Sequence, residues 1–436
     1  MAGLRRVDPA LLAICAFVAV AGIWNTLRYP PGLGYDAIAH MAYASGLVPG
    51  GHLPPSTGPL ATEYYTPPGY YALAGSADWI AHKLGASTYA SFRAGMGLNA
   101  LFLLATVVLV WCIARDLWPE RRRIRIAATL FTALAPVAAK TASMFHPEPL
   151  ALALATLALW LVVRAFRDAR YAIPLGLALG AAQLVRASTL WTVAVVLLAL
   201  AVGRRFRLLA IVLALAVVVP LPWYVHQEIR YGGDPVFPRP ATTLARVGAN
   251  PVAKPKPLWD RQPLRFYFDP GIPDVITKPY SPAFGSTSSG LAIPITYDEL
   301  WGDYEGVWAW KANHLDAQPS SGAHAELTIQ SVVGLLPTLI AVVGWLVLLR
   351  SSLRRPDRLA IALLPLVGLL GYVYFTTSYP TPGGDVLKAT YMLTTLGGWA
   401  VGFAYGLDRL RGRWWTVTVA LLAVCALADL PYLFYF

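Results

Sequence analysis

The chain has 436 residues, of which 57% are apolar and 13% are charged, and its formal net charge is +12. A soluble domain carries about 25% charged residues, so this composition excludes an ordinary soluble protein. Several apolar stretches reach the ~20 residues that a helix needs to cross ~30 Å of hydrocarbon. The sequence therefore predicts an all-α polytopic membrane protein.

The positive charge is distributed in a way that argues against a nucleic-acid partner. Twenty of the 35 Lys and Arg residues lie in six short clusters between apolar stretches, near 5–6, 115–125, 164–170, 204–207, 350–358 and 409–413. Cytoplasmic loops of membrane proteins carry such an excess of cations. We therefore expect these clusters, and the N-terminus, to be cytoplasmic.

Apolar stretches and basic loops together predict about eleven transmembrane helices. They fall near 10–28, 97–116, 124–141, 148–165, 172–185, 187–203, 208–226, 328–349, 359–377, 389–407 and 415–434. The three cysteines lie far apart inside these stretches and indicate neither a disulfide framework nor a metal site. Arg outnumbers Lys by 28 to 7, which hints at a GC-rich bacterial genome.

Two long segments then lie outside the membrane, at 29–96 and 227–327. In the first, small and aromatic residues repeat with a period near 3.6, which predicts interfacial helices. The second is rich in Pro, Trp, Tyr and Asp and is too long for a simple connection, so we expect an extracytoplasmic cap. This divides the chain into a transmembrane catalytic module at 1–226, the cap, and C-terminal helices at 328–436.

Asp36 and His40, in "GYDAIAHMAYASG", follow the first apolar stretch at a spacing that puts both on one helix face. The acid is a candidate general base that the imidazole orients. The alternative is a cap, because Asp is favoured at helix N-termini.

The other polar candidates on the outer side lie in two motifs. "EYYTPPGYY" contains Glu63 and Tyr65, either as part of an aromatic belt or as a sugar-contacting platform with Glu63 pointing inward. "SMFHPEPLAL" places His146 and Glu148 between two predicted spans. Two such ligands are weak evidence for a divalent cation, and the alternative for Glu148 is a favourable place at a helix start.

Three cations lie near predicted outer span ends, where cations are depleted: Lys140, Arg186 and Lys388. Charge at that depth is costly, so these residues are candidates for binding a phosphate group. The alternative is that their side chains extend to lipid headgroups. Because no phosphate-binding loop or nucleotide signature is present, an activated substrate must come from the lipid or the exterior.

The motifs, in this order, resemble the GT-C superfamily of integral-membrane glycosyltransferases, and within it the bacterial protein O-mannosyltransferases and aminoarabinose transferases. "GYDAIAHMAYA" is similar to the first outer-loop motif, "YYTPPGYYALAG" to the next stretch, and "LAPVAAKTASMFHPEPLALAL" to the second acidic motif. Further similar stretches are "SFRAGMGLNALFLLATVVLVWCIARDLW", "GLALGAAQLVRASTLW", "PLPWYVHQEIRYGGDPVFP" and "GGDVLKATYMLTTL".

The resemblance implies a sugar transfer from a polyprenyl-phosphate donor to an acceptor hydroxyl, with inversion. Asp36 would be the catalytic base, with Glu148 and His40 beside it. The donor phosphate would bind Arg186, Lys388, Lys140 and Arg93, and Glu63, Tyr65, His146 and Tyr391 would contact substrate. Metal dependence is left open, a divalent cation included.

These expectations place the protein in a bacterial inner membrane, with the active site on the extracytoplasmic side and a lipid, glycan or protein as acceptor. Two other classes of function remain as alternatives. A lipid or polysaccharide transporter would favour titratable residues in mid-membrane and matched broken helices, and a non-catalytic assembly protein would use the 227–327 cap.

Overall fold

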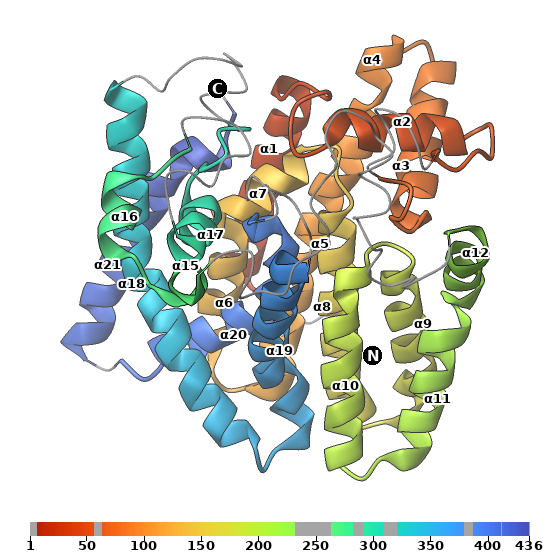
Figure 1. The fold of residues 1–436 in the computed structure, drawn as a ribbon. Helices are drawn as coiled ribbons and strands as arrows, with labels where there is room; N and C mark the ends of the chain where they lie inside the picture. Colours follow the sequence, from red (N-terminus) through yellow and green to blue (C-terminus); the bar gives the residue numbers. More distant parts are fainter. Residues whose placement is uncertain are drawn as a thin grey trace.

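A computed structural model describes residues 7–55, 63–231, 263–281, 291–308, 321–378, 387–410 and 412–435, and every regular element in these ranges is a helix (Figure 1). The first half of the chain contains α1 Pro9–Arg28, α2 Ala37–Leu47, α3 Gly69–Lys83, α4 Thr88–Ser91, α5 Arg93–Leu117, α6 Arg122–Leu134, α7 Pro136–Ser143, α8 Glu148–Ala165, η2 Ala169–Tyr171, α9 Ala172–Gln183, η3 Ala187–Thr189, α10 Leu190–Val202, α11 Phe206–Val218 and α12 Leu221–Tyr231. The second half contains α15 Leu264–Phe268, α16 Ile272–Thr277, α17 Ala292–Trp301, α18 Ser321–Ser352, α19 Pro356–Ser378, η4 Ala389–Thr395, α20 Leu396–Leu407 and α21 Arg413–Leu433.

Helices occupy all eleven ranges predicted as spans, but not all of them are long enough to cross a bilayer alone. Within the described ranges, six helices meet the length and apolarity that a span requires. Counting the bent pairs α6–α7 and α11–α12 as single spans raises the number to eight. Helices α9 and α20 have 12 residues each, or about 18 Å at ~1.5 Å per residue. The predicted total of eleven is therefore not confirmed.

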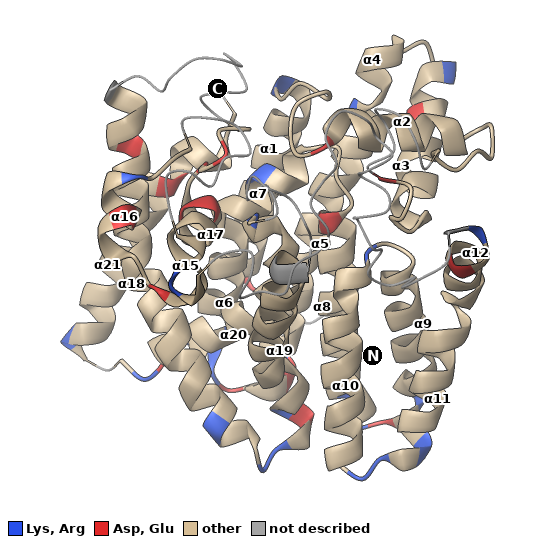
Figure 2. Cartoon of the chain, viewed as in Figure 1, with Lys and Arg blue, Asp and Glu red and all other residues tan. Residues whose placement is uncertain are grey.

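The basic residues gather at one end of the helices. Figure 2 shows Lys and Arg at the α10–α11 and α18–α19 turns, at the end opposite α2 and α3. This separation matches the charge pattern in the sequence, and the orientation in a membrane stays a prediction. Short helices α2, α3 and α4 do fill the first outer segment, while their place at a membrane interface also stays a prediction.

The main core lies between α5, α6, α8–α11 and α18–α20 and is made almost entirely of Ala, Val, Leu and Ile. Its closest helix crossing is between α18 and α20. A Cβ atom at Gly344 would overlap the carbonyl oxygen of Gly402, and one at Gly406 would lie 2.8 Å from the Cα atom of Gly344. Small residues let helix backbones approach in this way where lipid supplies no hydrophobic driving force.

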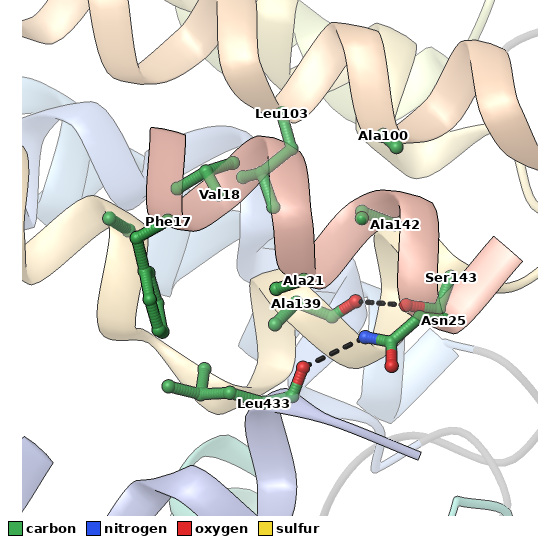
Figure 3. Close-up of a pocket in the computed structure, with 12 residues that line it drawn as sticks. Phe17, Val18, Ala21, Asn25, Ala100, Leu103, Ala139, Ala142, Ser143 and Leu433 are labelled. Carbon is green, nitrogen blue, oxygen red and sulfur yellow. Dashed lines mark hydrogen bonds between the residues drawn. The ribbon is translucent and has the colours of Figure 1, made fainter. Parts of the chain in front are cut away.

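Asn25 joins the first helix to the last. It lies on α1 and is 1% exposed, and its Nδ2 donates to the carbonyl of Leu433 at 2.8 Å beside an apolar crevice lined by α1, α5 and α7 (Figure 3). Its Oδ1 accepts from the backbone N–H of Tyr435 at 2.8 Å. The amide therefore satisfies backbone groups where α21 ends, and it fixes the C-terminal ends of α1 and α21 together.

Only part of the expected 227–327 cap lies in the described residues. The described part of the cap includes α15, α16 and α17, and α17 packs against α7, α18 and η4. The remainder, at 232–262, 282–290 and 309–320, lies outside the described residues. The described part of the cap thus contacts both the N-terminal module and the C-terminal helices.

The close approach of α18 and α20 predicts that two Gly→Ala substitutions differ sharply in their effect on stability. We expect Gly344→Ala to destabilise the protein by about 1–3 kcal/mol through overpacking, and so to lower its thermal unfolding midpoint in detergent. Gly97→Ala on α5 is the matched control, because its nearest obstacle is the Thr26 Cγ2 atom at 3.9 Å. Equal midpoints for the two variants would contradict the close crossing.

Candidate active site

Asp36 immediately precedes α2, but its side chain does not cap the helix. Its backbone has a φ of 51°, and its side chain makes no hydrogen bond to the α2 N-terminus. This left-handed conformation costs a residue other than glycine roughly 1–2 kcal/mol. The side chain is 44% exposed, although Tyr35 and Ala37 on either side are buried. The capping alternative therefore does not hold, and the carboxylate faces a space that solvent reaches.

Lys388 is the direct partner of Asp36. It precedes η4, 352 residues away in sequence, and its Nζ lies 3.5 Å from Asp36 Oδ2. The Nζ also lies 5.2 Å from the centre of the Tyr35 ring. The charge of Lys388 lowers the pKa of Asp36, with a smaller contribution from His40, against the opposing effect of burial. Asp36 is consequently held in its ionised form.

His40 lies one helical turn beyond Asp36, in a buried polar network. Its Nδ1 is 2.8 Å from the Tyr71 hydroxyl and 3.5 Å from Glu63 Oε2. Glu63 also accepts from the Thr66 hydroxyl at 2.6 Å. Burial lowers the pKa of His40, although Glu63 and Asp36 act against this. A neutral imidazole can both donate and accept hydrogen bonds, so it can orient a bound hydroxyl group.

Arg186 connects this network to Glu148. The guanidinium Nε lies 2.7 Å from Glu148 Oε1, and Nη1 lies 3.5 Å from the Thr66 hydroxyl. Burial alone would lower the pKa of Arg186, but the carboxylates of Glu148 and Glu63 together outweigh burial and raise the pKa above its usual value. Glu148 is 0% exposed, and its Oε2 has no hydrogen-bond partner among the described residues. Arg186 is 14% exposed in its side chain and so remains open on one side.

His146 closes the cluster from the α7–α8 connection. Its ring packs edge-on against His40, with centroids 4.8 Å apart, and its Nδ1 accepts from the backbone N–H of Glu148 at 3.3 Å. Asn99 on α5 holds this connection by donating to the carbonyls of Met144 and His146 at 2.8 and 2.9 Å. Burial lowers the pKa of His146 well below its usual value.

The remaining candidates in this region are Tyr391, Tyr65 and Arg93. Tyr391 follows Lys388 in η4, and its ring packs edge-on against Phe375 with ring centroids 4.9 Å apart. Tyr65 packs edge-on against Tyr64. Arg93 donates to the carbonyls of Thr26 and Leu27 at the end of α1, where it helps to terminate that helix.

Lys140 lies deeper, with a side chain that is 0% exposed. Its ammonium contacts Glu299 Oε1 at 2.5 Å and the Gly302 carbonyl at 3.0 Å. The sequence places it with the candidate phosphate-binding cations, whereas in the fold its contacts lie in the described part of the cap. The sequence does not single out Tyr35, Thr66, Tyr71 or Glu299. Of these, Thr66 and Tyr71 lie in the quoted "EYYTPPGYY" motif, and the density of polar and aromatic residues there was the available signal.

The described residues include no group of three or more His, Cys, Asp or Glu side chains arranged to hold a metal ion. The divalent cation that the sequence left open therefore stays a prediction.

Two comparisons bear on the fold. Residues 77–224 match the family model for dolichyl-phosphate-mannose-protein mannosyltransferase, which spans Lys140, His146, Glu148 and Arg186. The solved structure of ArnT from Cupriavidus metallidurans bound to undecaprenyl phosphate superposes with a TM-score of 0.50 over 96% of this chain, at 16% identity. The chain has the fold of the GT-C glycosyltransferases. This confirms the resemblance drawn from the ordered motifs.

A second GT-C structure is similar to the same extent. The archaeal oligosaccharyltransferase AglB from Archaeoglobus fulgidus, in complex with an inhibitory peptide and a dolichol phosphate, gives a TM-score of 0.55 at 14% identity over 98% of this chain. The chain spans 64% of the ArnT chain and 56% of the AglB chain. No curated protein matches the sequence.

The Arg186–Glu148 pair predicts a specific loss of stability. Arg186→Met would leave the buried Glu148 carboxylate unpaired, a change that costs about 3–5 kcal/mol in buried pairs. We expect a lower thermal midpoint, and partial recovery in the double variant Arg186→Met/Glu148→Gln. If the two substitutions destabilise additively, the pair is not coupled as the geometry indicates.

Proposed function

We propose that this chain is a glycosyltransferase that moves a sugar from a polyprenyl-phosphate donor to an acceptor hydroxyl. The observation that carries the proposal is the pairing of an accessible, ionised Asp36 with Lys388, beside Arg186. One carboxylate and two cations lie near one another there, and Asp36 immediately precedes α2, which lies at the end of the molecule opposite the α10–α11 and α18–α19 turns (Figure 2). This arrangement suits a reaction that removes a proton at one atom and leaves negative charge on another.

In the proposed reaction the acceptor O–H bond breaks, and its proton goes to the Asp36 carboxylate. The acceptor oxygen forms a bond to the anomeric carbon from the face opposite the phosphate. The bond between the anomeric carbon and the phosphate oxygen breaks, and its electron pair stays on the phosphate. A single displacement of this kind inverts the anomeric configuration.

Arg186 and Lys388 would stabilise the charge that develops on the leaving phosphate. Cations already in place require little reorganisation at the moment of reaction, and this kind of electrostatic stabilisation is a large term in enzyme catalysis. Arg186 has the planar donor geometry that matches two phosphate oxygens. Its partner Glu148 keeps it in position from the buried side.

The network around His40 would bind and orient the sugar or the acceptor. Glu63, Tyr71 and His40 present a carboxylate, a phenol and an imidazole within 3.5 Å of one another. Such groups hydrogen-bond hydroxyls, and the neighbouring Tyr43 stacks on Tyr71 at 3.9 Å to fix its ring. Tyr65, His146 and Tyr391 remain proposed substrate contacts.

The ligands named for the two solved structures support a lipid-linked donor. ArnT is bound to undecaprenyl phosphate, and AglB is bound to a dolichol phosphate together with an inhibitory peptide. Both lipids have a phosphate on a polyprenyl chain, as the proposed leaving group does. We place the reaction on the extracytoplasmic face of a bacterial inner membrane, because Asp36 immediately precedes α2, and α2 lies at the end opposite the basic α10–α11 and α18–α19 turns.

Asp36→Asn tests the assignment of the base. The amide has nearly the same shape but cannot accept the proton, so we expect sugar transfer to fall by about 10²–10⁴-fold. The measurement is transfer in reconstituted vesicles from undecaprenyl-phosphate-linked sugars to extracted envelope lipids, glycans and proteins. Binding of undecaprenyl phosphate should persist within a few-fold.

Asp78→Asn is the matched control for this test. Asp78 on α3 bonds the Ser91 hydroxyl at the α4 end, away from the cluster, and its substitution should leave transfer intact. Full activity in Asp36→Asn would remove Asp36 from the role of base.

The Asp36–Lys388 pair also predicts a pH dependence. Lys388 lowers the pKa of Asp36, so the carboxylate stays ionised, and active as a base, to a lower pH than an unpaired aspartate would. In Lys388→Met the pKa should rise, and the acidic limb of the pH–rate profile should move to higher pH. Transfer measured from pH 3 to pH 8 checks this, and an unmoved acidic limb would mean that another group sets it.

A further inference from the structure

A second buried charge cluster lies beside the candidate active site, around Lys140 on α7. The ammonium contacts Glu299 Oε1 at 2.5 Å, the Gly302 carbonyl at 3.0 Å and Asp303 Oδ1 at 3.9 Å. The side chains of Lys140, Glu299 and Asp303 are all 0% exposed. An ammonium has three N–H donors, so these protein acceptors occupy it on the cap side and leave it little capacity for a phosphate.

The same carboxylates organise the backbone that follows α17. Glu299 Oε2 accepts from the backbone N–H of Glu305 at 3.0 Å, and the Asp303 carboxylate accepts from that of Trp308 at 3.0 and 3.2 Å. The chain from 299 to 308 is thus folded around one ammonium. Without Lys140, the buried Glu299 carboxylate would lose the ammonium that contacts it, and removing one partner of a buried ion pair is strongly destabilising.

This segment ends against the base of the first outer segment. Trp308 stacks on Tyr29 with ring centroids 4.8 Å apart, and the Tyr29 hydroxyl donates to the Val307 carbonyl at 2.7 Å. Tyr29 directly follows α1 and lies seven residues before Asp36. The 299–308 segment is therefore fixed at both ends, by Lys140 and by Tyr29.

The segment also supports Lys388. Ile295 and Tyr304 share a buried apolar cluster with Leu387, the residue before Lys388, and Tyr391 packs against this cluster. The centre of the Tyr35 ring lies 5.2 Å from Lys388 Nζ and 6.0 Å from Lys140 Nζ. One aromatic ring thus contacts both the base–cation pair and the buried cluster.

We propose that Lys140 is a positioning residue, which fixes the 299–308 segment of the cap so that this segment holds Lys388 within reach of Asp36. Lys140 acts through Glu299 and Asp303 and does not touch the substrate. The inference rests on the proposed function only where it assigns a catalytic role to the Asp36–Lys388 pair. It replaces the earlier expectation that Lys140 binds the donor phosphate.

Lys140→Met tests the proposal in the full-length protein in nanodiscs. We expect faster backbone amide hydrogen exchange across 299–308. We also expect kcat for sugar transfer to fall by up to about a hundredfold, since small misplacements of catalytic groups cost that much. The KM for the donor and the Kd for undecaprenyl phosphate should change much less than kcat, because Arg186 is held by Glu148 and not by the 299–308 segment.

Two further variants keep the test decisive. Glu299→Gln retains the side-chain shape and weakens only the charge pairing, so it should give the same pattern in milder form even if Lys140→Met fails to fold. Lys278→Met is the matched control. It removes a lysine from an exposed pair with Asp274, 3.1 Å away on α16 in the same cap, and it should change neither exchange in 299–308 nor kcat.

Three outcomes would overturn the proposal. Unchanged exchange across 299–308 in both Lys140→Met and Glu299→Gln would mean that the cluster does not fix the segment. Loss of undecaprenyl phosphate binding with unchanged exchange would make Lys140 a phosphate ligand. Faster exchange with unaltered kcat would separate the segment from the site. If the wild-type protein transfers no sugar at all, the proposed function fails, whereas the exchange comparison still decides whether Lys140 fixes the segment.

Discussion

The arrangement around the candidate site depends on the pairing of carboxylates with cations. Moving an ionised side chain into the interior costs several kcal/mol unless an opposite charge lies close, and three such pairs recur here. They are Glu148 with Arg186, Asp36 with Lys388, and Glu299 with Lys140. Each pair joins elements that are far apart in the sequence. The need to neutralise charge therefore acts as a set of long-range constraints, which bring the first outer segment, the α7–α8 connection, the cap and η4 to one place.

The three pairs differ in exposure. Glu299 and Lys140 are fully buried, with a 2.5 Å contact, and the Lys140 ammonium also contacts the Gly302 carbonyl and the Asp303 carboxylate. Asp36 is 44% exposed, and its contact with Lys388 is 3.5 Å. A looser, accessible pair can exchange its partner for a substrate group at lower cost. Arg186 is intermediate, with its back held by Glu148 and its front open towards Thr66.

The sequence predicted the helical character of this protein well. Apolar stretches and Arg-rich loops indicated a helical membrane protein, and helices occupy each predicted range because a segment in lipid must satisfy its own backbone hydrogen bonds. The number of spans was predicted less well, because hydropathy does not show that α9 and α20 are short or that α6–α7 is bent by 50°. Among the candidate site residues, the cost of charge near the membrane pointed to Asp36, Glu148, Arg186 and Lys388, and the fold brings them together while their roles stay predictions. The sequence could not show that Lys140 pairs with Glu299, which lies 159 residues away.

What the sequence alone determined is the kind of protein: a helical membrane protein with acids, histidines and unexpected cations on the side opposite its basic loops, in an order that resembles the GT-C glycosyltransferases. Composition and local spacing suffice for this, since both act over one helix or one loop. The partner of each charge was decided only by the tertiary structure. The sequence allowed Asp36 to be a helix cap, and the fold gives it a left-handed backbone and turns its carboxylate towards Lys388. That choice depends on long-range contacts, those of Lys388 with Asp36 and of Trp308 with Tyr29, which no local pattern encodes.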